Sequence, residues 1–249
     1  MNDNDFHSFP HLRRLTRAQT RLGRWQLHLA LSLKRASWLT LVHGTRVAKR
    51  VVDIAIAAPV LLLSSPVLLV VACLIRLDGG PVFFRQQRIG YLGRAFGMWK
   101  FRSMCVDAES RLAALLAQNE KAGGITFKMA HDPRITRIGR WIRRTSIDEL
   151  PQLFNVLAGE MSIVGPRPPL PREVALYSVE DRRRLLAVPG ITGLWQVGER
   201  TGGTFEIGDR NAIDFDEQVR LDINYIEQHS IWRDLWIMLK TPPAMLLGK

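Results

Sequence analysis

The longest hydrophobic stretch of the chain runs from Val51 to Ile75 and carries one charged residue, Asp53, near its start. About 25 apolar residues in succession match the thickness of a bilayer and fit the core helix of a soluble protein poorly. Basic residues flank both ends of the stretch, and the positive-inside rule would then place both ends on the cytoplasmic face. We therefore predict a membrane segment that enters and leaves on the same side, with a straight span as the alternative.

Prolines interrupt this hydrophobic stretch. Pro59 and the sequence Ser64-Ser65-Pro66 lie inside it, and a proline removes one helix hydrogen bond and bends the axis. The backbone carbonyl freed at Pro66 needs a partner inside a membrane, and the hydroxyls of Ser64 and Ser65 are candidates. We predict a re-entrant helix-break-helix over residues 46–78, broken at Ser65 and Pro66.

The segment before the hydrophobic stretch is basic and carries leucines and Trp25 at helical spacing among arginines. This pattern suits an amphipathic helix on an anionic membrane surface, and it equally suits a helix that caps the protein's own core. We assign residues 1–45 to a basic amphipathic N-terminal extension. Near the other end, residues 231–247 are rich in Trp, Leu and Met, and we expect them to lie against the bilayer.

After the membrane segment the pattern changes to short elements. Residues 81–89 and 95–104 have the character of two strands joined through residues 90–93, a hairpin in which basic and aromatic residues alternate. Helices are expected over residues 106–120 and 146–157. These elements predict an α+β fold, mostly helical, with a small β-hairpin.

The chain has 249 residues, enough for one ordinary domain with attachments, and we assign residues 79–249 to a cytoplasmic catalytic domain with membrane-surface helices. Its formal net charge of +12 favours nucleic acid, anionic lipid or a phosphorylated ligand as partner. A non-enzymatic basic protein that binds membranes or nucleic acid would explain this charge and the hairpin. It would not explain a broken apolar segment followed by paired carboxylates. Cys73 and Cys105 show neither metal spacing nor a disulfide framework, which favours a reducing compartment.

Two adjacent carboxylates, Asp148 and Glu149, lie where a helix is expected to begin. Ser146 with Glu149 matches a capping box, which alone would be a structural feature. Four arginines in residues 137–144 create a positive field that keeps a carboxylate ionised, and a helix N-terminus also favours phosphate. This combination suits phosphoryl transfer, because one carboxylate can attack phosphorus while its neighbour holds Mg²⁺.

A further basic residue, Arg167, lies between Pro166 and Pro168. Because prolines fix the backbone, the arginine can be preorganised for bidentate contact with a phosphate. A surface turn would explain the same three residues equally well.

Six motifs follow one another along the chain, at Lys49–Asp53, Ser65-Pro66, Trp99–Met104, Ser146–Val156, Met161–Pro168 and Pro189–Val197. In this order they resemble the bacterial sugar transferase family, the monotopic polyprenyl-phosphate phosphoglycosyl transferases. The resemblance covers roughly residues 46–245, and several long motifs in the right order are far more specific than any one of them.

The resemblance implies a two-step, ping-pong reaction. Asp148 would attack the sugar-bearing phosphate of a UDP-sugar and release UMP, and the phosphosugar-aspartyl intermediate would then react with undecaprenyl phosphate. Glu149 would bind Mg²⁺ as cofactor. The substrate-binding positions of the family are matched by Lys100, Arg143, Arg167 and Asp234.

The resemblance also implies a place in the cell and a pathway. The enzyme would sit in the bacterial inner membrane with its catalytic domain on the cytoplasmic side, in contact with lipids and not with nucleic acid, and could form a homodimer. The Gly193–Gln196 sequence is similar to that of the family members that initiate exopolysaccharide or O-antigen assembly. Of the two expected donor classes, UDP-hexose and UDP-N-acetylhexosamine, this similarity favours a hexose. Residues 201–210 form an apparent insertion that would alter sugar preference if it reaches the sugar. The chain also lacks the membrane helices that large members of the family carry before this domain.

Overall fold

The computed structural model describes residues 21–115, 132–197, 199–200, 203–204 and 213–247. Within these ranges the chain is mostly helical, with three small two-stranded sheets, as the sequence predicts. The elements, in order, are α2 (Arg21–Leu77), β1 (Phe83–Ile89), β2 (Ala95–Phe101), α3 (Ala108–Leu115), α4 (Arg137–Arg144), the 3₁₀ turn η4 (Ile147–Glu149), α5 (Gln152–Ala158), β3 (Ser162–Val164), α6 (Pro171–Val174), the 3₁₀ helix η5 (Asp181–Leu186), β4 (Gly190–Thr192), α7 (Leu194–Val197), β5 (Glu199–Arg200), β6 (Gly203–Thr204), α8 (Phe215–Glu227) and α9 (Ile231–Leu247).

The chain divides into two compact units, residues 1–49 and residues 50–249. In the first unit, residues 21–49 are helical, and Leu22 and Trp25 are exposed. The predicted extension is thus helical from Arg21 onward, its role as an amphipathic membrane-surface helix stays a prediction, and residues 1–20 lie outside the described part of the chain. The predicted insertion at residues 201–210 also falls mostly outside it, as does the end of the helix expected over residues 106–120.

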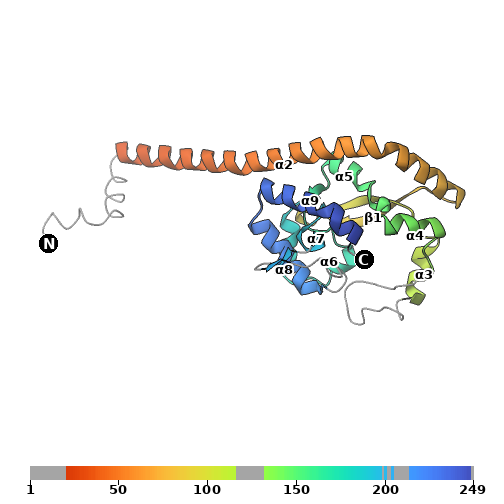
Figure 1. The fold of residues 1–249 in the computed structure, drawn as a ribbon. Coiled ribbons are helices and arrows are strands. Elements are labelled where there is room, and N and C mark those ends of the chain that lie inside the picture. The colour runs from red at the N-terminus through yellow and green to blue at the C-terminus, as the bar shows by residue number, and fades with distance from the viewer. Residues whose placement is uncertain (1–20, 116–131, 198, 201–202, 205–212, 248–249) are drawn as a thin grey trace. The chain divides into compact units, whose positions relative to one another are not determined.

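Helix α2 continues through the predicted break. Pro59 and Pro66 both lie inside it, and Figure 1 shows its orange and gold part curving without a gap in the ribbon. The separation into two helices at Ser65 and Pro66 is therefore not confirmed. The expected hydroxyl partner is present: Ser65 Oγ donates to the Leu62 carbonyl at 2.7 Å, and this is the carbonyl that the missing N–H of Pro66 would have bonded.

Over Gly44–Leu77, α2 is long and apolar enough to cross a membrane, by length and composition alone. Within residues 50–77 its two faces differ. Ala57, Val71 and Ile75 are buried against the rest of the second unit. The opposite face exposes large apolar side chains, among them Leu62, Leu63, Leu69, Val70 and Leu77.

The hairpin forms as predicted. Strands β1 and β2 are antiparallel, with Phe84 opposite Lys100 and Arg88 opposite Phe96. The connection is the predicted segment 90–93, in which Leu92 adopts a positive φ of 54°. Because side chains alternate across a strand, Phe96, Met98 and Lys100 lie on one face of β2.

Two apolar clusters join α2 to the hairpin. Ala57 packs with Phe96 and Met98 of β2 and with Leu153 and Val156 of α5. Further along α2, Val71 and Ile75 pack with Phe101 and with Ile142 of α4. In Figure 1 α5 and β1 accordingly lie beneath α2.

A third cluster lies under the C-terminal helices. It joins β3, α7, α8 and α9 through the buried residues Val164, Leu194, Val197, Leu221, Tyr225 and Ile237. The parallel strands β3 and β4 approach closely at two glycines, since a Cβ on Gly190 would lie 2.1 Å from the Gly165 nitrogen. Only glycine fits this approach, which fixes where the chain leaves β3 for Pro166 and Arg167.

Candidate active site

The paired carboxylates lie on a tight turn between α4 and α5. Ser146, just before this turn, has a positive φ of 55° and makes no side-chain cap. The predicted capping box of Ser146 with Glu149 is therefore wrong: Glu149 points away from the turn and contacts other elements. A non-glycine residue in this conformation costs on the order of 1–3 kcal/mol, and such strain is typical of functional segments.

Glu149 is held by two cations from other elements. Its Oε1 lies 2.9 Å from Lys100 Nζ of β2 and 3.5 Å from Arg167 Nη2. Burial raises the pKa of Glu149, but the charges of Lys100 and Arg167 outweigh burial and hold the pKa well below its usual range. Glu149 is thus ionised at any physiological pH, and the structure brings three of the predicted site residues together.

Asp148 lies beside this cluster in a different state. Asp148 is 8% exposed, and among the described residues no side chain donates a hydrogen bond to its carboxylate. Burial raises the pKa of Asp148 to about 6, with Lys100 and Arg143 opposing the rise and Glu149 adding to it. A buried carboxylate without a side-chain partner, close to cations, is available to react.

Burial lowers the pKa of the Lys100 ammonium, and the Arg167 charge adds to this effect while Glu149 opposes it. Arg143 lies in the last turn of α4, is exposed, and is close enough for its charge to affect Asp148. Three predicted cations therefore surround two carboxylates, which leaves the site with an excess of positive charge. An excess of this kind suits a phosphorylated ligand.

Sequence reasoning missed Arg88, which is buried on β1. Its Nη1 donates to the Pro168 carbonyl at 2.8 Å, and the Ile89 amide donates to the Pro169 carbonyl at 2.9 Å. Burial and the Arg167 charge lower the pKa of Arg88 to about 10. Arg88 thus holds the loop that carries Arg167. Strand alternation could have found it, because the hairpin register places Arg88 on the same face as Lys100.

Asn155 of α5 fixes the helix to the edge of β2. Its Oδ1 accepts from the Trp99 amide at 2.9 Å, and its Nδ2 donates to the Gly97 carbonyl at 2.9 Å. Lys100 follows Trp99 directly, and Glu149 precedes α5 by a short turn. This fully buried side chain therefore sets the register between the two groups of the ion pair.

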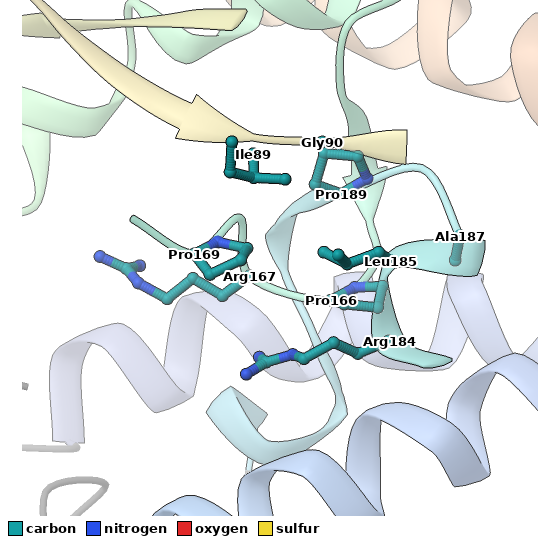
Figure 2. A pocket seen from close by; sticks show the side chains of 9 residues that line it. All are labelled: Ile89, Gly90, Pro166, Arg167, Pro169, Arg184, Leu185, Ala187 and Pro189. Atoms are coloured by element: carbon teal, nitrogen blue, oxygen red, sulfur yellow. The ribbon is translucent and has the colours of Figure 1, made fainter. Parts of the chain in front are cut away.

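A small hollow lies beside Arg167 (Figure 2), lined by Ile89, Gly90, Pro166, Arg167, Pro169, Arg184, Leu185, Ala187 and Pro189. Arg184, on its lower side in the picture, is committed to an ion pair with Asp222 and a hydrogen bond with Tyr177. Arg167 is 35% exposed in its side chain. Arg167 is therefore the arginine of this hollow that can meet a ligand from solution.

Asp234, predicted to bind substrate, belongs to a second network at the start of α9. It accepts a hydrogen bond from Tyr225 at 2.7 Å and pairs with His229 at 3.2 Å, and it is 3% exposed. Burial is the largest cause of a raised pKa for Tyr225, and the Asp234 charge adds to it. Direct substrate contact by Asp234 stays a prediction.

The site's capacity for Mg²⁺ depends on its oxygen atoms. Both ion pairs of Glu149 use Oε1, which leaves Oε2 as an acceptor, and the neighbouring residue Asp148 is close enough for the Glu149 charge to raise its pKa. Among the described residues, no group of three or more His, Cys, Asp or Glu side chains gathers around a potential metal position. Mg²⁺ is commonly bound by one or two carboxylates together with substrate phosphates, so the residues fit this ion when a phosphorylated ligand supplies the remaining oxygens.

Comparison with known proteins finds a matching family and several relatives. The profile of the bacterial sugar transferase family matches residues 44–248. The chain is 49% identical over 202 residues to the galactosyl transferase CpsE of Streptococcus agalactiae, covering 81% of this chain and 43% of that protein. It is 40% identical over 207 residues to the undecaprenyl-phosphate galactose phosphotransferase of Salmonella typhimurium, covering 82% of this chain and 41% of that protein. It is 39% identical to the exopolysaccharide production protein ExoY of Rhizobium meliloti, covering 81% of this chain and 87% of that protein.

Proposed function

Because the chain belongs to the bacterial sugar transferase family, we propose that it transfers a sugar-1-phosphate from a UDP-sugar to undecaprenyl phosphate. The chain spans less than half of the first two relatives, so their activity is carried over as part of this proposal. The single observation that carries it is the buried Asp148 carboxylate, which receives no hydrogen bond from any side chain that the structure describes and lies beside an ionised Glu149 and three cations.

The reaction proceeds in two displacements at one phosphorus atom. In the first, an Asp148 carboxylate oxygen forms a bond to the sugar-bearing phosphorus, and the bond from that phosphorus to UMP breaks. In the second, an oxygen of undecaprenyl phosphate attacks the same phosphorus, and Asp148 leaves as a carboxylate. The product is a diphosphate-linked lipid, and Asp148 is ready for another turnover.

The cations act on the phosphates throughout. Arg167, supported by Arg88 through the Pro168 carbonyl, and Arg143 at the end of α4 bind phosphate oxygens and neutralise developing charge. Lys100 holds Glu149 in place. Glu149 would hold Mg²⁺, and the ion would supply positive charge that lowers the repulsion between the Asp148 carboxylate and the phosphate. Asp234 accepts a hydrogen bond from the Tyr225 hydroxyl, which also lies 3.2 Å from the Val164 carbonyl. Asp234 therefore supports the end of β3, from which the chain continues to Arg167.

The apolar part of α2 enters and leaves the membrane on one side. Residues 79–249, here called the catalytic unit, hold α2 near both ends of its apolar part, because Asp53 accepts a hydrogen bond from the Ile163 amide and Arg102 donates to the Ile75 carbonyl at 3.0 Å. These contacts lie 22 residues apart along α2, about 33 Å at 1.5 Å per residue, which is about the thickness of the hydrocarbon core. A straight span would place two contacts of one unit on opposite sides of the bilayer. The apolar face with Leu62 and Leu63 meets lipid.

With α2 in this orientation, the proposed site lies at the inner-membrane surface, on the cytoplasmic side. A soluble UDP-sugar and a lipid-tethered phosphate can both reach Asp148 there. The names of the relatives favour UDP-galactose or UDP-glucose as donor, and initiation of exopolysaccharide or a related glycan as the role.

The test is UMP release by detergent-purified protein with Mg²⁺ and a panel of UDP-sugars, with and without undecaprenyl phosphate. The proposal predicts turnover with one UDP-hexose and the lipid, and exchange of labelled UMP into that UDP-sugar without the lipid. A protein shown to be folded that releases UMP from none of the sugars would contradict the proposed donor class. Turnover without UMP exchange would contradict the two-step path.

Topology is tested separately in a variant without Cys73 and Cys105. Single cysteines introduced at residues 46 and 78 should both react with an impermeant reagent from the cytoplasmic side of membrane vesicles. Labelling of the two positions from opposite sides would contradict the one-sided path of α2.

A further inference from the structure

Two polar residues one helical turn apart on α2, Arg50 and Asp53, reach into the catalytic unit. Asp53 is 5% exposed although it lies at the start of the longest apolar stretch of the chain. A buried polar side chain at such a position is costly unless its hydrogen bonds are satisfied. Arg50 contacts α5, which follows the turn with the carboxylate pair, and Asp53 contacts β3, which leads to Arg167.

Asp53 holds the beginning of β3. Its Oδ1 accepts from Ser162 Oγ at 2.9 Å and from the Ile163 amide at 3.0 Å. Strand β3 ends at Val164, and the chain continues directly to Arg167. Because only a few residues separate the strand from Arg167, the hydrogen bonds of Asp53 to β3 also fix the position of Arg167.

Arg50 holds the end of α5. Its guanidinium donates to the Val156 carbonyl and, at 2.7 Å, to the Leu157 carbonyl. These groups belong to the last turn of the helix, where carbonyls lack partners within the helix and a cation is favourable. Helix α5 follows the turn that carries Asp148 and Glu149, so Arg50 fixes the other half of the site.

We propose that Asp53, together with Arg50, is a positioning residue for the phosphoryl transfer, an inference that rests on the proposed function. One turn of α2 holds both segments, and this sets the separation between the carboxylate pair and Arg167. The measure of that separation is the 3.5 Å between Glu149 Oε1 and Arg167 Nη2. A displacement of about 1 Å in such a site can cost about a hundredfold in rate. The apolar helix is therefore part of the active-site framework as well as the membrane anchor.

The experiment compares UMP release by four proteins. Asp53→Ala removes both acceptor bonds, and we expect it to lower the rate about 10- to 100-fold. Asp53→Asn keeps an oxygen that can accept both bonds, and we expect it to restore the rate to within about threefold of the unsubstituted protein. Thr241→Val is the matched control, because it removes a hydrogen bond of 2.8 Å to Thr192 between α9 and β4, and its rate should not change.

A double-mutant cycle with Arg167→Ala separates positioning from general destabilisation. If Asp53 acts by placing Arg167, then Asp53→Ala should cost less than about twofold in a protein that already lacks the arginine, because coupled residues are not additive. A purely structural role would leave the full 10- to 100-fold effect in both backgrounds, and that result would overturn the proposal.

Two safeguards keep the outcomes distinct. If Asp53→Ala does not fold, Ser162→Ala removes one of the two bonds from the strand side, and an unchanged rate in it would overturn the proposal. Failure of the unsubstituted protein to release UMP would instead count against the proposed function. An active unsubstituted protein with an equally active Asp53→Ala variant would count against the positioning role alone.

Discussion

Asp53 and Asp148 are almost equally hidden from solvent, at 5% and 8% exposure, but the protein uses them differently. Asp53 accepts two hydrogen bonds from β3 and joins α2 to the catalytic unit. Asp148 accepts none from any described side chain, and burial raises its pKa to about 6. The hydrogen bonds of Asp53 fix β3 to α2, whereas the described part of the chain offers no side-chain donor to Asp148.

The difference shows that two buried aspartates of one chain can serve different purposes. A buried carboxylate with its hydrogen bonds satisfied stabilises one arrangement of the chain, while one without them lowers stability and remains reactive. Glu149 combines the two situations. Its Oε1 is paired with Lys100 and Arg167, which keep the carboxylate ionised, and its Oε2 is left for a ligand. The four predictions below test this division.

The largest effect is expected from neutralising the reactive acid. Asp148→Asn removes the proposed nucleophile and should lower UMP release by at least about 1,000-fold, as for loss of other covalent catalytic groups. Asp53→Asn makes the same chemical change in the positioning acid, and its rate of UMP release should stay within about threefold of the unsubstituted protein. Equal losses in the two variants would erase the distinction between them.

Lys100→Met tests the charge that holds Glu149. Removing one preorganised electrostatic contact in an active site typically costs about 100- to 1,000-fold in rate, and we expect the lower end because Arg167 remains. Arg111→Met, which removes an exposed ion pair with Asp107, is the control and should change the rate by less than about twofold. A Lys100 variant as active as this control would show that the ion pair is not used in catalysis.

The stability of the protein should show the cost of Asp148 in metal-free buffer. The pKa of Asp148 is about 6 in the folded chain and near 3.8 when exposed, so the folded state binds more protons between these values and loses stability as pH rises through them. Asp148→Asn should therefore raise the free energy of unfolding at pH 7.5 by about 1–3 kcal/mol. The gain should vanish below about pH 4. Thermal unfolding over pH 4–8 measures it.

The control for this measurement is Asp107, which is exposed. Hydrogen bonds from Cys105 and Arg111 lower its pKa, so it stabilises the folded state above its ordinary pKa. Asp107→Asn should shift stability in the opposite direction to Asp148→Asn. A gain at neutral pH in both variants would point to a general charge effect in this basic chain.

The smallest effect is expected at the helix bend. Ser65→Ala removes the hydroxyl that donates to the Leu62 carbonyl beside Pro66. It should lower the free energy of unfolding by about 0.5–1.5 kcal/mol, which thermal unfolding would show as a slightly lower midpoint. Ser110→Ala, at an exposed hydroxyl bonded to the Asp107 carbonyl, should have a smaller effect. An unchanged Ser65 variant would indicate that the freed carbonyl has another partner.

Much of the fold could be predicted from the sequence because its signals are local. The apolar stretch before Leu77, the hairpin with its turn and the carboxylate pair each show in neighbouring residues. The predicted break at Pro66 was not confirmed, since one side-chain hydrogen bond and a bend accommodate a proline within a continuous helix. The capping box was wrong because Glu149 gains more from Lys100 and Arg167 than from a helix N-terminus.

The parts of the site that sequence could not reveal depend on contacts between distant segments. Asp53 and Ser162 are 109 residues apart, and Asn155 and Gly97 are 58 apart. Their roles follow from the packing of α2 and α5 on the hairpin, which periodicity does not show. The resemblance indicates which residues are expected to react, while the contacts that hold those residues in place emerge only from the structure.

The most direct test of the central claim is to trap the covalent intermediate. The protein is incubated with Mg²⁺ and its UDP-sugar without undecaprenyl phosphate, quenched, digested and analysed by mass spectrometry. The account predicts one sugar-phosphate adduct on the peptide that contains Asp148, which disappears when the lipid is added and is absent in Asp148→Asn. An adduct on another residue, or lipid product formed without any adduct, would contradict the assignment of Asp148 as the nucleophile.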